Sequence, residues 1–281
     1  MLLLATALTL AATPPRGAWA AIELEGKLDG RVGKAPLHVY VPAGTAKQFP
    51  LVIALPGWNH TPELWRSKSD LGALADRYGF VLAVPQLGKS IYETRFYPES
   101  KSSWTVAPGA RWVGEVVLPW LRAHYPVASE RAHTAIIGYS TGGRGALLVA
   151  EAYPEFAFVG SLSGTFDLLR LDPKDGEYRI HAALYGERDA FPERWKLDNC
   201  VEPARLEQLG DTRVYAAHGA DDRVVKPDQL AALQGALPAG EFVLVPRAGH
   251  DWAFWNAQWP VVFERAAKAL SAPARGSPSP R

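Results

Sequence analysis

Short apolar runs alternate with longer amphipathic stretches through most of this 281-residue chain, from about residue 34 to residue 270. Alternating or fully apolar runs predict strands at residues 36–41, 50–55, 80–84, 133–137, 156–162, 213–217 and 242–245. Apolar residues spaced three and four apart predict helices at residues 62–78, 110–124, 141–153, 228–237 and 260–270. The alternation predicts an α/β fold whose mostly parallel central sheet is covered by helices on both faces. In such sheets, ligands bind at the carboxyl ends of the strands.

Two stretches depart from this alternation. Residues 86–109 predict a long irregular loop rich in Ser, Pro, Gly and aromatic residues, and loops of this kind are usually functional. Residues 165–210 mix turn signals with short helical patterns, which predicts a cap-like insertion over the sheet. Residues 21–270 are otherwise predicted to form one domain. Residues 271–281 offer little to bury and predict a disordered tail.

The N-terminus has the pattern of an export signal. Residues 2–12 form an apolar run of the length of a signal-peptide core, and residues 18–20 have the small-x-small form of a cleavage site. Pro14 interrupts the run before it could span a membrane. One departure from the pattern is that no Lys or Arg precedes the run. We expect residues 1–20 to be a signal peptide and the mature protein to be periplasmic or secreted, without stable membrane insertion.

Charge and cysteine content narrow the function classes. The 30 basic and 29 acidic residues are scattered, and no basic stripe with interleaved aromatic residues predicts nucleic-acid binding. Cys200 is the only cysteine, so no internal disulfide can form, and its surroundings predict a small buried residue and not a nucleophile. The function is therefore expected in a site for a small molecule.

The motif G-x-S-x-G occupies residues 138–142, between a predicted strand and a predicted helix. This is the sequence of a nucleophile elbow, in which a strained turn exposes the Ser140 hydroxyl. Side chains at Gly138 and Gly142 would collide there, and the N-terminus of the following helix favours negative charge beside the serine. The alternative interpretation is a helix cap, with Ser140 or Thr141 bonding free N–H groups.

A serine hydroxyl needs a base, and the base needs an orienting acid. Where the serine sits in such an elbow, the acid and then the histidine follow it in the chain. His250 follows the last predicted strand, and Asp221 and Asp222 follow the strand before it. All three lie at the sheet edge expected for Ser140, and the pattern alone leaves Asp221 and Asp222 open. The other histidines lack this order or context: His38, His60, His124, His133, His181 and His218.

Acyl transfer also requires hydrogen-bond donors for the developing oxyanion. One donor in such sites is the backbone N–H after the nucleophile, here Thr141, and the other comes from a loop after an early strand. The second fits Gly57 and Trp58, where Gly57 permits close approach and the Trp58 N–H donates.

Four segments together resemble the esterase D-like “putative esterase” family, which includes S-formylglutathione hydrolases, feruloyl esterases and mycolyltransferases. They are LPGW at 55–58, GYSTGG at 138–143, HGADDRVV at 218–225 and AGHDWAFW at 248–255. The resemblance covers roughly residues 34–268 and implies an α/β-hydrolase fold. It also implies Asp222 as the acid, because the family's aspartate stands four residues after the HG histidine. Pro56 replaces the usual histidine and Thr141 the usual Met or Ala, which leaves the backbone donors in place.

We therefore expect a serine-dependent carboxylic ester hydrolase, with Ser140, Asp222 and His250 as its triad and an acyl-enzyme intermediate. No metal or organic cofactor is expected. Trp58, Asn59, Trp104 and Trp252 are the expected substrate-binding residues, and their aromatic rings suit phenolic or sugar-linked esters. An acyltransferase with the same triad, a thioesterase and a serine peptidase remain alternatives.

Overall fold

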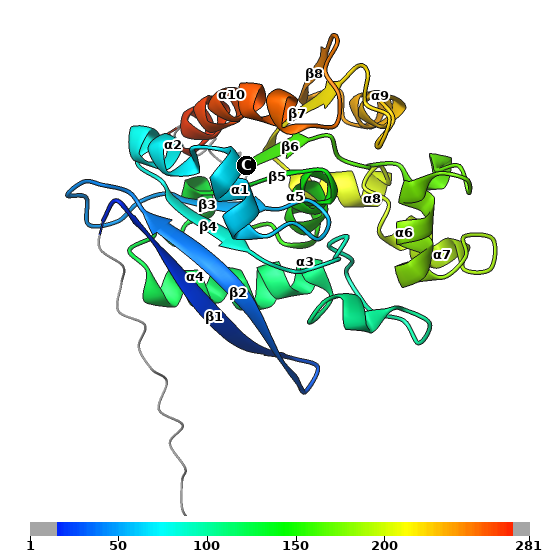
Figure 1. Cartoon of the computed structure of the whole chain (residues 1–281), viewed down its shortest axis with the longest axis horizontal. Helices are drawn as coiled ribbons and strands as arrows, with labels where there is room; N and C mark the ends of the chain where they lie inside the picture. The colour runs from blue at the N-terminus through cyan, green and yellow to red at the C-terminus, as the bar shows by residue number, and fades with distance from the viewer. Residues whose placement is uncertain (1–15, 272–281) are drawn as a thin grey trace, which may run out of the picture.

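The computed structural model describes residues 16–271 and places eight strands in one sheet, in the order β1-β2-β4-β3-β5-β6-β7-β8 (Figure 1). The strands are β1 Ala18–Leu28, β2 Arg31–Val41, β3 Leu51–Leu55, β4 Val81–Pro85, β5 Thr134–Tyr139, β6 Phe158–Leu162, β7 Arg213–Gly219 and β8 Glu241–Val245. β2 is antiparallel to β1 and β4, and all pairs from β4 to β8 are parallel. This topology, with helices on both faces, confirms the predicted α/β-hydrolase fold.

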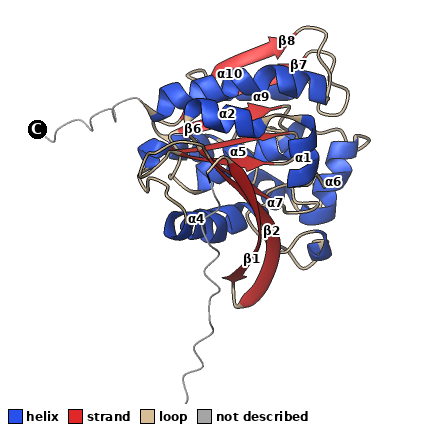
Figure 2. Cartoon of the chain, turned by 60° about the vertical axis from the view of Figure 1, so that its left-hand side comes forward, coloured by secondary structure: helices blue, strands red, loops and turns tan. Residues whose placement is uncertain are grey.

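Helices cover both faces of the sheet (Figure 2). The longer helices are α1 Pro62–Lys68, α2 Leu71–Tyr78, α4 Leu118–His124, α5 Thr141–Ala152, α6 Gly176–Tyr185, α9 Asp228–Ala236 and α10 Trp252–Leu270. The shorter ones are α3 Gly109–Arg111, α7 Pro192–Leu197 and α8 Pro203–Leu206. Single turns and one π-helix complete the set: η1 Ser102–Trp104, η2 Trp112–Val117, η3 Arg131–His133, η4 Leu168–Arg170 and η5 Glu207–Leu209.

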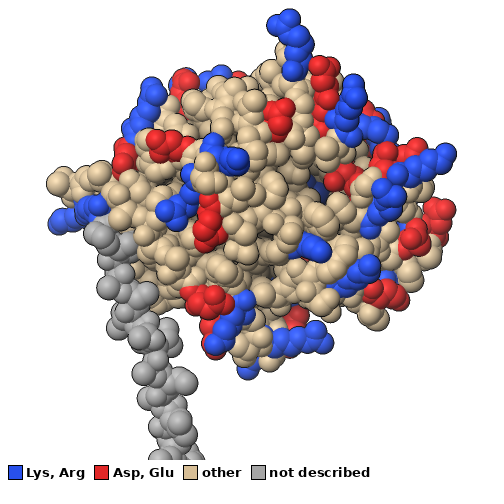
Figure 3. Space-filling model, in the orientation of Figure 1, with Lys and Arg blue, Asp and Glu red and all other residues tan. Residues whose placement is uncertain are grey.

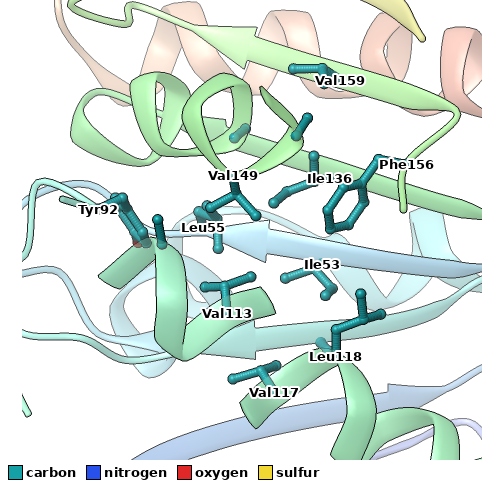
Figure 4. Packing of buried hydrophobic residues seen from close by; sticks show 14 of the residues in the cluster. Ile53, Leu55, Tyr92, Val113, Val117, Leu118, Ile136, Val149, Phe156 and Val159 are labelled. Atoms are coloured by element: carbon teal, nitrogen blue, oxygen red, sulfur yellow. The ribbon is translucent and has the colours of Figure 1, made fainter. Parts of the chain in front are cut away.

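The central strands are apolar throughout because each face enters a different core. In β3, Ile53 and Leu55 pack with residues of η2, α4 and α5, whereas Val52 and Ala54 pack with residues of α1, α2 and α10. Figure 4 shows the first of these cores, with Ile53 and Leu55 facing Val113. The alternation of side chains along a strand thus assigns successive residues to opposite layers.

The first strand was absent from the prediction. β1 forms a hairpin with β2, and the predicted cleavage motif at residues 18–20 lies at its start, where Ala18, Trp19 and Ala20 pair with residues 39–41. The apolar run at residues 2–12 lies outside the described residues, as does the tail after Ser271. The signal peptide and the disordered tail therefore stay predictions.

Two predicted helices have different bounds. The helix predicted at residues 62–78 is broken in two, because Asp70 caps α2 by accepting a hydrogen bond from the Ala73 N–H. The helix predicted from residue 260 begins at Trp252, where Asp251 accepts from the Phe254 N–H, and Pro260 lies inside it. The AGHDWAFW segment at residues 248–255 therefore includes the first turn of α10.

Residues 165–210 form η4, α6, α7, α8 and η5 with the turns between them, and α6 and α7 lie at one end of the molecule (Figure 1). They share a third apolar cluster with the 86–109 loop, in which Ile91, Tyr97 and Trp104 pack with Tyr185 and Trp195. The two stretches that were least readable from pattern thus pack against each other.

Candidate active site

Ser140 stands between β5 and α5 with φ 56° and ψ −128°, a conformation that non-glycine residues rarely adopt. The glycines on either side are needed for space. A Cβ at Gly142 would lie 2.0 Å from the Leu55 carbonyl oxygen, and one at Gly138 would lie 2.2 Å from the Gly142 carbonyl oxygen. The turn therefore has the strain and the close packing expected of a nucleophile elbow.

The structure brings Ser140, His250 and Asp222 together. His250 Nε2 lies 2.9 Å from Ser140 Oγ, and His250 Nδ1 lies 2.7 Å from Asp222 Oδ2. Because a carboxylate only accepts, Nδ1 carries the proton and Nε2 is free to accept from the serine hydroxyl. This is the hydrogen-bond chain that a serine, a general base and an orienting acid require.

Asp222 is fixed by several donors. Its Oδ1 accepts hydrogen bonds from the N–H groups of Val224 and Val225, both at 2.9 Å. Burial alone would raise the pKa of the Asp222 carboxyl, but hydrogen bonds from His218 and His250 outweigh burial and hold this pKa below its ordinary value. Asp222 is therefore ionised beside His250, whereas its neighbour Asp221 is exposed.

The candidate oxyanion donors lie at the same place. A Cβ at Gly57 would come within 3.3 Å of the Ser140 Cβ, so the turn that carries Trp58 lies directly against the serine. Within residues 16–271, the backbone N–H groups of Trp58 and Thr141 have no hydrogen-bond acceptor. Both are free to donate to an oxygen of a substrate.

The predicted substrate-binding residues fall into two groups. Trp58 and Trp104 form an edge-to-face pair with ring centroids 5.9 Å apart and belong to the cluster beneath the insertion. Trp252 belongs to the opposite core and stacks on His60 at 6.0 Å. Asn59 is exposed, adopts a positive φ, and donates its N–H to the Gly88 carbonyl oxygen.

His60 and Trp255 are also close to the site. His60 Nδ1 lies 2.9 Å from the Tyr139 hydroxyl oxygen, and burial, together with the nearby His250, lowers the pKa of His60. Trp255 is buried in α10, where its ring meets His250 edge-on with the centroids 5.2 Å apart. The Trp255 indole therefore packs against the His250 imidazole and is too buried to contact substrate.

A buried glutamate near the triad was missed by the sequence analysis. Glu177 of α6 accepts a hydrogen bond from the Thr165 hydroxyl at 2.6 Å, and burial raises its pKa even though His250 lies near enough to oppose this. Within the described residues, no three His, Cys, Asp or Glu side chains are grouped to hold a metal ion.

A second buried network, also missed, lies behind the nucleophile turn. The guanidinium of Arg144, fully buried one turn into α5, donates to the carbonyl oxygens of Ile91 and Asp198 and to the Tyr185 hydroxyl. The Asp198 carboxylate in turn accepts from the Thr94 N–H and hydroxyl. Arg144 thereby ties α5 to both the 86–109 loop and the insertion.

The sequence profile of the family described as “Putative esterase” matches residues 33–265. The chain belongs to this family. Family membership confirms the predicted carboxylic ester hydrolase. The match spans β2 to α10 and so includes the elbow, the Asp222 loop and the His250 loop.

Curated relatives of this esterase act on esters by name. An acetyl esterase from Caldicellulosiruptor saccharolyticus is 25% identical over 216 residues, which cover 73% of this chain and 78% of that protein. Feruloyl esterase B from Neurospora crassa is 27% identical over 159 residues, which cover 56% of this chain and 52% of that protein.

Solved structures show the same fold. A ferulic acid esterase superposes with a TM-score of 0.70 at 18% identity and covers 90% of this chain and 98% of its own. An S-formylglutathione hydrolase from Agrobacterium tumefaciens gives 0.71 at 16% identity, covering 90% and 95%. These likenesses confirm the predicted fold.

On the face shown in Figure 3, basic and acidic side chains are interspersed. Among the described residues, none of the helices is both long enough and apolar enough to cross a bilayer.

Proposed function

We propose that this esterase hydrolyses carboxylic esters through an acyl-enzyme on Ser140. The observation that carries the proposal is the hydrogen-bond chain from Ser140 Oγ through the His250 imidazole to the Asp222 carboxylate. No other histidine of the described residues bonds the Ser140 hydroxyl, so the base is assigned to His250.

In the first half-reaction, His250 Nε2 takes the proton of the Ser140 hydroxyl as Oγ attacks the ester carbonyl carbon. The carbonyl electron pair moves to the oxygen, which is bound by the N–H groups of Trp58 and Thr141. The C–O bond to the alcohol then breaks, and His250 returns the proton to the leaving alcohol. The products of this step are the free alcohol and the acylated serine.

In the second half-reaction, water attacks the acyl carbon while His250 takes one of its protons. Collapse of the tetrahedral intermediate releases the carboxylic acid and returns the proton to Ser140. Asp222 remains ionised throughout and stabilises the imidazolium that forms in each half. Each donor to the oxyanion contributes on the order of 3 kcal/mol to the transition state.

The Trp58 and Trp104 pair favours a substrate whose acyl or alcohol part contains a ring. Indoles pack well against phenolic and sugar rings. We further propose that the enzyme acts outside the cytoplasm, because of the apolar run and the small residues before Ala21. Fractionation of cells that express the full chain, with N-terminal sequencing of the product, tests this proposal.

The experiment that tests the mechanism is hydrolysis of a p-nitrophenyl ester by Ser140→Ala. We expect turnover to fall by roughly a thousandfold or more while the circular dichroism spectrum and melting temperature are kept. Wild-type protein should show a burst of p-nitrophenol equal to the enzyme concentration when the second half-reaction is slow. Retained turnover by Ser140→Ala would refute the mechanism.

A further inference from the structure

The loop after β4 places an ammonium group against the two tryptophans of the site. Lys89 Nζ lies 5.5 Å from the ring centroid of Trp58 and 5.5 Å from that of Trp104. A second ammonium, that of Lys101, lies 5.2 Å from the Trp104 ring on an exposed side chain. The half-buried Lys89 thus contacts both indoles from within the loop that the sequence predicts to be functional.

The position of Lys89 is fixed by its own backbone. Its N–H donates to the Trp104 carbonyl oxygen at 3.1 Å, and its carbonyl oxygen accepts from Trp58 Nε1 at 3.0 Å. The preceding Gly88 needs its positive φ and its missing side chain, because a Cβ there would lie 2.8 Å from the Trp104 carbonyl oxygen. The Lys89 backbone is therefore held between the two tryptophans, and its ammonium lies against both rings.

The same contacts place the lysine near the reaction. Trp58 follows Gly57, whose hypothetical Cβ lies 3.3 Å from the Ser140 Cβ, and Trp58 supplies a proposed oxyanion donor. The Lys89 ammonium lies against the indole of Trp58, a residue of that turn. A ring that packs on Trp58 in a bound ester thus has the ammonium within reach of its substituents.

Neither ammonium is neutralised by a protein carboxylate. Within residues 16–271, no Asp or Glu oxygen lies within 4.0 Å of Lys89 Nζ or Lys101 Nζ, whereas Arg194 in the insertion forms an ion pair with Glu99. Indole faces stabilise a cation without cancelling its charge. The charge therefore stays available to an anion.

The buried Glu177 of α6, near the triad, does not oppose this. Glu177 is held by Thr165, and burial raises its pKa, so it repels an incoming anion less than an exposed glutamate would. Of the two acids in the 86–109 loop, Glu99 is paired with Arg194, and Glu93 is fully buried and accepts hydrogen bonds from the Ser90 hydroxyl and the Ile91 N–H.

We propose that Lys89, with Trp58 and Trp104, selects esters in which a ring bears a carboxylate, such as an acidic aromatic or a uronic-acid group. This inference rests on the proposed ester hydrolysis and deepens it. A carboxylate that forms a hydrogen bond to a half-buried ammonium gains more than one in bulk water, because the pair is partly desolvated. Lys101 adds a second, more exposed charge.

The test compares matched charged and neutral esters. One pair, 3-carboxyphenyl acetate and 3-carbamoylphenyl acetate, differs by a charge on the alcohol. The other, a p-nitrophenyl ester of 3-carboxybenzoic acid and its carbamoyl counterpart, differs by a charge on the acyl group. The measured quantity is the ratio of kcat/KM for the charged ester to that for the neutral ester, which cancels changes common to both.

We expect the ratio to exceed one in wild type for at least one pair, and Lys89→Met to lower that ratio about tenfold. Lys89→Arg should keep most of it, and 0.5 M salt should reduce it in wild type, as expected for an accessible ion pair. The matched control is Lys34→Met, which removes an exposed lysine of β2 that pairs with Glu25. It should leave the ratio unchanged.

A ratio that is unchanged by Lys89→Met in both pairs would overturn the inference while leaving ester hydrolysis intact. Failure of wild type to hydrolyse the neutral esters would instead count against the proposed function. Calorimetry measures binding without hydrolysis and so tests the inference independently of the proposed function. Ser140→Ala should bind the charged ester with a lower Kd than the neutral one. Equal binding of the two by Ser140→Ala also rejects the inference.

Discussion

His250 Nε2 lies 2.9 Å from Ser140 Oγ although 110 residues of chain separate the two. The distance is that of an ordinary hydrogen bond. Ser140 is held by the elbow after β5, and His250 is held by the turn between β8 and α10. Their alignment therefore depends on the register of the sheet between them, and substitutions that disturb either loop report on the same contact.

Asp222→Asn tests the orientation of the base. An amide cannot hold the Nδ1–H tautomer of His250 as a carboxylate does, so kcat for a p-nitrophenyl ester should fall by about 10⁴-fold with little loss of stability. The matched control is Asp221→Asn, at the exposed neighbouring residue. A comparable loss in both variants would mean that the acid was assigned to the wrong residue.

Gly142→Ala tests the packing of the elbow. The added Cβ would lie 2.0 Å from the Leu55 carbonyl oxygen, so β3 and the turn must separate, at a cost of about 1–3 kcal/mol in the free energy of unfolding. Gly235→Ala, in α9 with nothing within 4 Å of the new Cβ, should be neutral or stabilise the protein by up to about 1 kcal/mol. Urea denaturation measures both, and an unchanged midpoint for Gly142→Ala would show that the strands do not meet so closely.

Arg144→Met tests the network behind the nucleophile. Removal of the guanidinium leaves the Ile91 and Asp198 carbonyl oxygens and the Tyr185 hydroxyl without their donor, all inside the protein. The free energy of unfolding should fall by about 3–5 kcal/mol. Arg31→Met, on the exposed part of β2, should change it by less than about 0.5 kcal/mol. Equal midpoints for the two variants in urea would contradict a structural role of Arg144.

Glu93→Gln tests the pH dependence of stability. Burial raises the pKa of Glu93 to about 7, above its ordinary value, so the folded state binds this proton more tightly than the unfolded state. The stabilisation is full below pH 4.5 and is lost as pH rises through about 7.

Wild type should therefore lose stability relative to Glu93→Gln between pH 5 and pH 8, by up to about 3 kcal/mol. Melting temperatures of the two proteins across this range measure the difference. If the difference does not change with pH, Glu93 does not titrate in this range in the folded state.

The parts that the sequence predicted are those governed by local rules. β3 and β5 were readable because both of their faces are buried, and Ser140 was readable because the elbow requires glycine on both sides. His250 and Asp222 followed from chain order and from the family resemblance. Their geometry in the structure is as expected, and their catalytic roles stay predictions until tested.

The parts that the sequence did not predict depend on distant residues. β1 mixes charged and apolar residues and begins inside a segment that resembles a cleavage site. The sequence pattern therefore did not indicate a strand paired with β2. Pro260 suggested a helix start because proline favours the first turn. Arg144 and Glu93 are charged residue types that are usually exposed, and only their partners elsewhere in the chain explain their burial.

The position of the base in the chain has a consequence for synthesis. A ribosome adding about 5–20 residues per second needs on the order of 5–20 s to proceed from Ser140 to His250. During this interval the nascent chain carries the serine without its base. Hydrolysis by the proposed triad therefore begins only after β8 has joined the sheet and α10 has docked. The time at which activity appears during translation would thus report when the fold is complete.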